Sequence, residues 1–236
     1  MTKAVFITAT GTDVGKTYIS GLLVKKMREL GYNCVYYKPA LSGAVECAGE
    51  IIPGDCDYVL KQAGISAPAS DYVSYIFKPA VSPHLAAQIE NNPIRLNKIK
   101  DDFEKIKKKF DYVVVEGAGG IVCQVKEDGI LLYGFNLKEE KLMLPDVIKA
   151  LGLDILVVAS ASLGTINSTV LTVEYAKQQG INVKGIILNN YNKDDMMQVD
   201  NKNQVENLTG INVVETVADN QDDLKINNIE SVFEEV

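Results

Sequence analysis

The chain has 236 residues, a formal net charge of −7 and 47% hydrophobic residues. This length allows a substantial core and is compatible with a single α/β domain spanning residues 1–236. The acidic balance disfavours nucleic acid as a partner, and the apolar runs are too short to span a membrane.

Apolar strand-like runs alternate with helical patterns along the chain. We predict strands, in chain order, at residues 3–9, 33–38, 111–116, 154–160, 183–189 and 212–217. We predict helices at about residues 16–30, 55–63, 83–91, 95–109, 140–151, 166–179, 194–209 and 227–234. Runs such as DYVVVEG lack polar alternation, as expected for strands buried on both faces. Right-handed crossovers then predict a doubly wound, mostly parallel α/β sheet with helices on both faces.

The segment GTDVGKT connects the first predicted strand to the first predicted helix. Its backbone N–H groups and the helix N-terminus suit a phosphate, the Lys16 ammonium suits the outer phosphates, and the Thr17 hydroxyl suits Mg²⁺. We therefore predict a P-loop NTPase-like fold that binds a nucleoside triphosphate. Nucleotide contacts are expected from Asp13, Val14, Gly15, Lys16, Thr17 and Tyr18. The usual pattern has glycine at the position of Thr10, whereas this loop has its glycine at Gly11.

Charged residues end two further predicted strands, where ligands bind in sheets of this kind. Lys38 ends the second strand, as a cation directed at the site of Lys16 or as a lysine whose head reaches water. Glu116 ends the third strand, where phosphate-loop enzymes place a metal ligand, and a glycine-rich turn follows it. The alternative for Glu116 is a surface carboxylate beside an ordinary turn.

Several other polar residues can be interpreted locally, and some of them in two ways. Asp55 suits a helix N-cap or a metal ligand, and Asp57 competes with it for the second role. His84, in Ser-Pro-His, is typical of a helix start. Asn189 and Asn190 end the fifth strand and suit either a turn or the edge of a nucleobase.

The N-terminal sequence and the cysteines indicate the compartment. The first residues carry one charge and run directly into the phosphate loop, so we expect no secretory signal. Four cysteines lack metal-site spacing, which favours free thiols in the reducing cytoplasm over disulfides or a zinc site.

Taken together and in order, these segments resemble the ATP-dependent dethiobiotin synthetases. The parallels are VGKT, then YKP-x-x-SG, a following Asp, SPH, VEGAGG, LGTIN and a strand ending in Asn, covering residues 5 to about 190. VEGAGG also occurs in related amide-forming synthetases, whereas YKP-x-x-SG with SPH and LGTIN is more specific. The resemblance implies closure of the ureido ring of dethiobiotin from 7,8-diaminononanoate, CO₂ and MgATP, through a phosphorylated carbamate.

The resemblance also implies roles for individual residues. Lys16 and Lys38 would be catalytic, holding the carbamate and the migrating phosphoryl group, while Thr17, Asp55 and Glu116 would bind Mg²⁺. The nucleotide would further contact Gly117, Ala118, Gly119, Asn189 and Asn190. The diamine or its carbamate would contact Thr12, Lys38 and Ser42, with Gly164, Thr165 and Asn167 acting across the interface of a homodimer.

Two departures and two rivals accompany this resemblance. The family usually has glycine at the position of Ala9, and a proline-containing turn where this chain has residues 216–220. These departures leave the preference for ATP over other triphosphates open. A chromosome-partitioning or septum-positioning ATPase is the first rival, but its extra lysine early in the loop is absent here. A cobyrinate-type amide synthetase is the second, but it needs a glutaminase domain.

Overall fold

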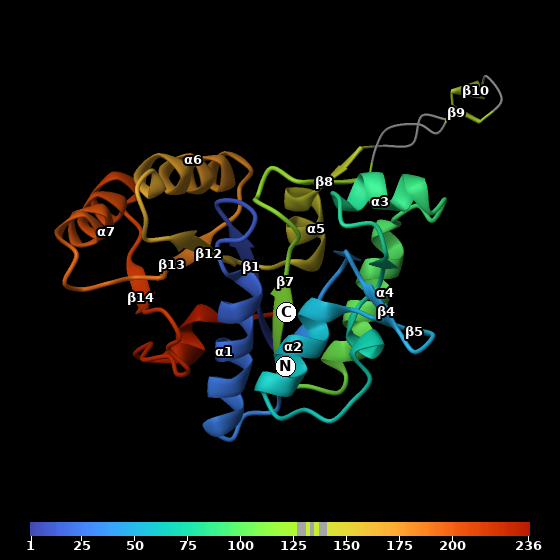
Figure 1. Cartoon of the computed structure of the whole chain (residues 1–236), viewed down its shortest axis with the longest axis horizontal. Coiled ribbons are helices and arrows are strands. Elements are labelled where there is room, and N and C mark those ends of the chain that lie inside the picture. The colour runs from blue at the N-terminus through green and yellow to red at the C-terminus, as the bar shows by residue number, and fades with distance from the viewer. Residues whose placement is uncertain (127–130, 133–134, 137–140) are drawn as a thin grey trace.

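The computed structural model describes residues 1–126, 131–132, 135–136 and 141–236, with a central sheet covered by helices (Figure 1). Within these residues, six strands run parallel in the order β14-β13-β12-β1-β7-β2. Their bounds are β1 Lys3–Ala9, β2 Cys34–Tyr37, β7 Tyr112–Glu116, β12 Ile155–Ser160, β13 Val183–Asn189 and β14 Val213–Val217. The predicted doubly wound, mostly parallel sheet is therefore confirmed.

The centre of the sheet is fully buried. Val113, Val114 and Val115 of β7 have no exposed surface, and neither do Phe6 and Ile7 of the adjacent β1. β-Branched side chains pack well on a pleated surface that is covered on both faces, which explains why these runs form the central strands.

Helices connect the parallel strands on both faces of the sheet. Their bounds are α1 Lys16–Glu29, α2 Gly54–Gln62, α3 Pro83–Ile89, α4 Leu96–Lys107, α5 Leu144–Leu151, α6 Thr165–Gln178 and α7 Met196–Thr209. α1 packs against α2 on one face, while α4 and α5 pack together on the other (Figure 1). Most predicted helix bounds differ from the observed ones by only one or two residues, which is within the uncertainty that fraying gives to helix ends.

Short strand pairs form separate two-stranded sheets outside the central sheet. They are β3 Leu41–Ser42 with β6 Ile76–Phe77, β4 Val45–Cys47 with β5 Glu50–Ile52, β8 Gln124–Lys126 with β11 Leu142–Met143, and β9 Leu131–Leu132 with β10 Phe135–Asn136. The sequence did not predict them, because strands of two or three residues are too short to show a period.

The predicted helix at 227–234 is wrong. A single 3₁₀ turn at Ile229–Val232 is followed by β15, Glu234–Glu235, which pairs antiparallel with the start of β1. Phe233 is buried with its ring edge-on to Tyr112, at a centroid distance of 5.2 Å. Tertiary packing at the free start of β1 thus overrides the local helical pattern.

The predicted helix at 140–151 begins later than expected. Residue 140 lies outside the described residues, and Leu142–Met143 forms β11 instead. α5 begins at Leu144, with Pro145 in its first turn, and the backbone N–H of Met143 donates to the Asp146 carboxylate over 2.9 Å. Proline and an acidic residue favour a helix start, so the local sequence explains the shift.

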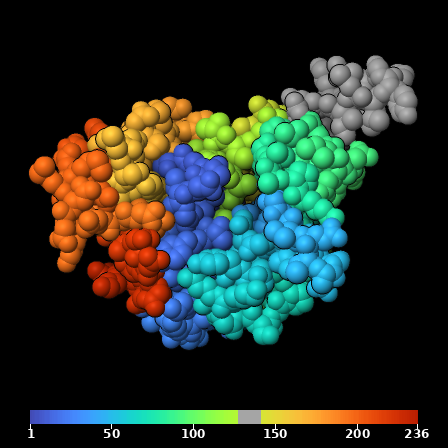
Figure 2. Space-filling model, viewed as in Figure 1, coloured from blue at the N-terminus to red at the C-terminus, as the bar shows by residue number. Residues whose placement is uncertain are grey.

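The loop after β14 is fastened to α1. The Tyr18 hydroxyl donates to the carbonyl of Gln221, and the Lys26 ammonium lies 2.8 Å from the Asp223 carboxylate. The C-terminal residues accordingly lie against α1 in Figure 2. Among the described residues, no helix has the length and apolar character needed to cross a membrane.

Candidate functional site

The phosphate loop follows the predicted path from β1 into α1. Gly15 precedes the helix with φ of +99°, a conformation that favours glycine. The Lys16 ammonium donates to the carbonyl of Gly11 over 3.0 Å. Burial lowers the pKa of Lys16, and the nearby Glu116 carboxylate offsets part of that effect. The loop therefore places a desolvated cation at the N-terminus of α1, where an anion is favoured.

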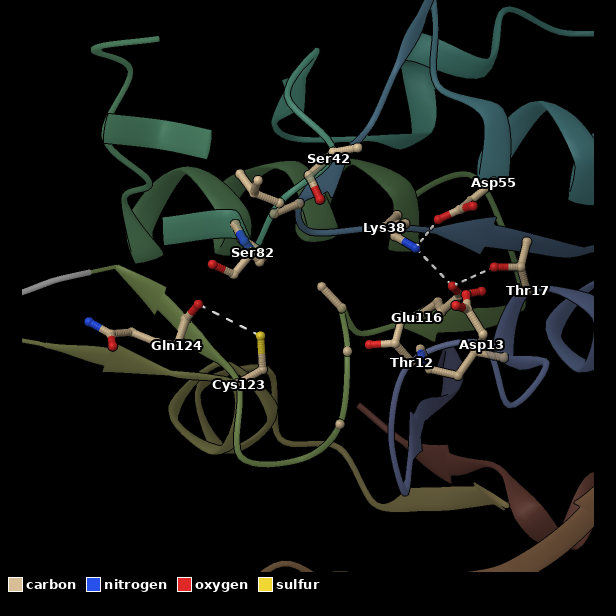
Figure 3. Close-up of a pocket in the computed structure, with 18 of the residues that line it drawn as sticks. Thr12, Asp13, Thr17, Lys38, Ser42, Asp55, Ser82, Glu116, Cys123 and Gln124 are labelled. Atoms are coloured by element: carbon tan, nitrogen blue, oxygen red, sulfur yellow. Dashed lines mark hydrogen bonds and ion pairs between the residues drawn. The ribbon is translucent and has the colours of Figure 1, made fainter. Parts of the chain in front are cut away.

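Lys38 lies between two carboxylates at the mouth of the sheet (Figure 3). Its ammonium donates to the Asp55 carboxylate and, over 2.8 Å, to Oε1 of Glu116. The same Oε1 accepts a hydrogen bond of 2.9 Å from the Thr17 hydroxyl. The structure thus brings together four predicted site residues, one directly after β2 and the others in α2, β7 and α1.

The carboxylates keep Lys38 charged. Burial alone lowers the pKa of its ammonium, but the Glu116 and Asp55 carboxylates outweigh that effect and raise the pKa above its usual value. Lys38 is 4% exposed and Glu116 is fully buried. Lys38 is therefore a paired, buried cation and not a lysine whose head reaches water, which was the alternative interpretation.

The backbone fixes this pair. β2 and β7 are neighbours, with Tyr37 opposite Val115, so Lys38 and Glu116 follow at the same level of the sheet. The backbone N–H of Lys38 donates to the carbonyl of Tyr72 over 2.9 Å. Main-chain pairing on both sides therefore sets where the ammonium and the carboxylate stand.

A cavity of about 1020 Å³ opens at these strand ends. Its lining includes the charged residues Lys16, Lys38 and Glu116 and the apolar residues Val81 and Val122. The predicted site residues that line it are Thr12, Asp13, Gly15, Lys16, Thr17, Tyr18, Lys38, Ser42, Asp55, Glu116, Ala118 and Gly119. Thr12 and Ser42 lie around the same space as Lys38 in Figure 3.

Asp57, the alternative metal ligand, faces elsewhere. Its carboxylate pairs with the Lys61 ammonium over 2.7 Å, one helical turn further along α2. Asp57 does not line the cavity, whereas Asp55 does. The geometry therefore favours Asp55 over Asp57.

The glycine-rich turn after β7 serves packing as well as access. A Cβ at Gly117 would lie 2.8 Å from the Phe6 ring, and Gly117 does not line the cavity. Gly119 lines it with φ of +61°. A Cβ at Gly120 would lie 3.3 Å from the carbonyl oxygen of Ala9. The turn can therefore lie directly against the phosphate loop.

Asn189 contacts the phosphate loop and does not line the cavity. Its amide nitrogen donates to the carbonyl of Val14 over 3.1 Å, and its Oδ1 is buried with no hydrogen-bond partner. Asn190 is exposed with φ of +56°, so it begins a turn. The Asn189 oxygen is therefore a buried acceptor without a partner beside the loop, and β13 and β2 lie on opposite sides of β1 in the sheet.

The residues predicted to act across an interface lie at the start of α6, outside this cavity. Gly164 precedes the helix with φ of +93°, and Asn167 is exposed. Thr165 is buried, with its hydroxyl 3.3 Å from that of Thr169. The Thr165 side chain is thus directed into its own subunit.

Ten cavity residues were not among the predicted site residues, and four of them have polar or ionisable side chains. Ser82 and His84 stand at the start of α3, and Cys123 and Gln124 at the start of β8. His84 Nδ1 lies 3.2 Å from the carbonyl oxygen of Gln124, so α3 and β8 meet there. The Ser-Pro-His segment was one of the motifs of the family resemblance, but taken by itself it indicated only a helix start.

Asp55 and Glu116 carry carboxylates, the type of side chain that binds Mg²⁺. Among the described residues no group of three or more His, Cys, Asp and Glu side chains is suited to a metal. Asp55, Glu116 and the Thr17 hydroxyl nevertheless gather at one point, and Oε2 of Glu116 is buried without a partner. Few protein oxygens are typical for Mg²⁺, which keeps water and phosphate ligands.

The fold and the phosphate loop together define a P-loop nucleoside triphosphatase-type domain. The AAA domain family model matches residues 3–225. The ParA family ATPase from Chlorobium tepidum TLS superposes with a TM-score of 0.55 at 13% identity, covering 94% of this chain and 87% of that one. The septum site-determining protein MinD from Pyrococcus horikoshii OT3 gives 0.53 at 15% identity, covering 93% and 82%. These likenesses show the fold alone.

Sequence relatives identify the family. A dethiobiotin synthetase of Clostridium botulinum (strain 657 / Type Ba4) is 52% identical over 202 residues, 86% of this chain and 85% of that protein. One from the Loch Maree strain is 44% identical over the full length of both chains. One from Brachyspira hyodysenteriae is 46% identical over 99% of this chain and the whole of the relative. The chain belongs to the family of ATP-dependent dethiobiotin synthetases.

Proposed function

We propose that this chain is a cyclo-ligase that closes the ureido ring of dethiobiotin from 7,8-diaminononanoate, CO₂ and MgATP. One substrate amine adds to CO₂ and loses a proton, which gives a carbamate. A carbamate oxygen then takes the γ-phosphoryl group, with ADP leaving. The second amine attacks the carbamoyl carbon, phosphate leaves, and a proton is lost as the ring closes.

The observation that carries this proposal is the position of Lys38. A phosphate loop alone fits many proteins, but here a second buried ammonium, that of Lys38, lines the same cavity as Lys16. Phosphoryl transfer depends on positioning and on neutralising negative charge. Lys16 would hold the triphosphate, and Lys38 would hold the carbamate at the transferring phosphoryl group.

Mg²⁺ would be held by Thr17, Asp55 and Glu116, and it would neutralise charge on the phosphates. The acceptor amine would contact Thr12 and Ser42. The aliphatic chain of the diamine suits the apolar residues of the cavity lining, which are Ala40, Ala80, Val81, Pro83 and Val122 among others.

The base of ATP would lie on the opposite side of α1 from Lys38, because the acceptor occupies the Lys38 side. Asn189 offers its unpartnered oxygen there, and Asn190 follows it. The backbone around Asp13, Val14 and the turn at 117–119 would surround the phosphates. An amide oxygen accepts from the amino group of adenine, which supports a preference for ATP.

We further propose a homodimer in the cytoplasm, with one domain spanning 1–236. The start of α6, with Gly164, Thr165 and Asn167, lies outside the cavity of its own chain. It would bind the substrate carboxylate of a second copy. The Thr165 side chain is directed inward and its backbone N–H donates to the carbonyl of Ser162 over 3.2 Å, so the exposed Asn167 side chain and the backbone at Gly164 would make the direct contacts there.

The decisive experiment is ADP release by the purified full chain with MgATP and bicarbonate, with and without 7,8-diaminononanoate. We expect release that depends on the diamine, with an equal amount of dethiobiotin. Lys38→Ala should abolish both, at a loss of at least about 10³-fold. Hydrolysis independent of the diamine would contradict the proposal and favour a nucleotide switch.

A further inference from the structure

The ammonium of Lys38 contacts both carboxylates that the proposed function assigns to Mg²⁺. It pairs with Asp55 and, over 2.8 Å, with Oε1 of Glu116. That same oxygen accepts the hydrogen bond of Thr17 over 2.9 Å. Every proposed metal ligand therefore contacts Lys38 directly or shares one carboxylate oxygen with it.

A metal ion that binds Asp55 and Glu116 would stand directly beside the Lys38 ammonium. Lys38 is 4% exposed and Glu116 is fully buried, so water screens neither charge effectively. A buried carboxylate needs a counter-ion, and Lys38 supplies it in the present arrangement. A divalent cation on the same oxygen would repel the ammonium strongly.

The remaining wall of the cavity offers Lys38 another place. Ser42 and Ser82 line the same space (Figure 3), and they belong to the part of the cavity that the acceptor would occupy. The lysine stem has four rotatable carbons, so its head can move while the backbone of Lys38 stays paired with Tyr72 and Ser74.

On the basis of the proposed function, we propose that Lys38 is a resident counter-ion that Mg²⁺ displaces. In the metal-free protein the ammonium neutralises Asp55 and Glu116. When the metal binds these carboxylates, the ammonium is released toward the acceptor. Lys38 thus competes with Mg²⁺ for the same ligands, and it becomes free for the carbamate only once the metal is bound.

Competition makes a measurable prediction about metal affinity without nucleotide. We would measure Mn²⁺ binding to the full chain by electron paramagnetic resonance, comparing wild type with Lys38→Met. Removing the competing charge should tighten Mn²⁺ binding at least about tenfold. Lys38→Arg keeps the charge and should stay within about threefold of wild type.

Lys61→Met is the matched control. It also removes a lysine paired with an aspartate of α2, but that aspartate, Asp57, lies outside the cavity. Its Mn²⁺ affinity should equal that of wild type. If Lys61→Met tightened binding and Lys38→Met did not, Asp57 would be the ligand and the proposal would be wrong.

A measurement on the wild-type chain covers the case in which Lys38→Met does not fold. An amine-acylating reagent should label the paired Lys38 slowly, and Mn²⁺ should accelerate that labelling severalfold, as read by mass spectrometry. Labelling of Lys61 should not change. Unchanged labelling of Lys38 under saturating Mn²⁺ would overturn the proposal.

The two levels of proposal fail separately. If wild type makes dethiobiotin but Lys38→Met binds Mn²⁺ no more tightly, or not at all, the displacement of Lys38 is refuted and the synthetase function stands. The metal would then use the free Oε2 of Glu116 beside an unmoved Lys38. If wild type makes no dethiobiotin, the proposed function itself is wrong.

Discussion

The amide nitrogen of Asn189 lies 3.1 Å from the carbonyl oxygen of Val14 and donates to it, which ties the end of β13 to the phosphate loop. A Cβ at Gly15 would lie 2.1 Å from that nitrogen, so the two segments are packed without a gap. Asn189 therefore supports the loop with its nitrogen and leaves its oxygen unpartnered.

Asn189→Ala should weaken nucleotide binding. The substitution removes the hydrogen bond to Val14 and the free acceptor, and a lost hydrogen bond of about 1–1.5 kcal/mol corresponds to roughly tenfold in affinity. We expect the KM for ATP to rise by about that factor with little change in kcat. Asn182→Ala, directly before the opposite end of the same strand, is the control and should leave the KM unchanged. An unchanged KM in Asn189→Ala would remove Asn189 from the nucleotide site.

Substitution of the acidic residues should show which of them bind Mg²⁺. Glu116→Gln and Asp55→Asn each remove a carboxylate from the point where Thr17 and Lys38 meet. The Mg²⁺ concentration for half-maximal activity should rise more than about tenfold in both. Asp57→Asn should leave the Mg²⁺ titration unchanged, because its carboxylate pairs with Lys61. A normal titration in Glu116→Gln would exclude it from the metal shell.

As pH rises, ATP affinity should begin to fall at a lower pH than it would if Lys16 had the pKa of an ordinary lysine. Burial lowers the pKa of Lys16 in the free protein, while Glu116, Asp55 and Asp13 partly raise it and Lys38 lowers it further. A bound triphosphate favours the ammonium, so affinity is full below the lowered pKa and declines as pH rises through it.

Equilibrium binding of ATP between neutral pH and pH ~10 would check this, since the ordinary lysine pKa is about 10.4. Lys16→Arg is the comparison, because its guanidinium stays charged and its profile should be flat over the same range. A wild-type profile as flat as that of Lys16→Arg would show that the charge of Lys16 does not govern binding.

Phe233→Ala should destabilise the fold without changing the site. The ring is 5% exposed and packs on Tyr112, so its loss should cost about 3–5 kcal/mol in the free energy of unfolding. Urea unfolding would measure this, and kcat of the folded fraction should remain normal. Glu235→Ala, an exposed neighbour, should stay within about 0.5 kcal/mol of wild type. A similar loss in both would mean that the burial of Phe233 is not what stabilises the C-terminus.

The sequence predicted the ends of the central strands well, because long apolar runs and glycine-rich turns are local signals. Lys38 and Glu116 were therefore placed correctly at strand ends. Their direct contact could not be predicted from local sequence patterns. The two residues are 78 positions apart, and only the order of the sheet brings β2 beside β7. Phe233 was misplaced in a helix for the same reason: the partner of its segment is β1, at the other end of the chain.

Because β2 and β7 are adjacent strands, the relative position of Lys38 and Glu116 depends on the sheet and not on the surface loops. The spacing between adjacent strands, about 4.8 Å, is set by backbone hydrogen bonds. Insertions in the loops that carry Val81 and Val122 would therefore reshape the outer wall of the cavity without moving Lys38 relative to Glu116. We therefore expect acceptor selectivity to diverge in such a scaffold while the proposed phosphoryl-transfer centre stays constant.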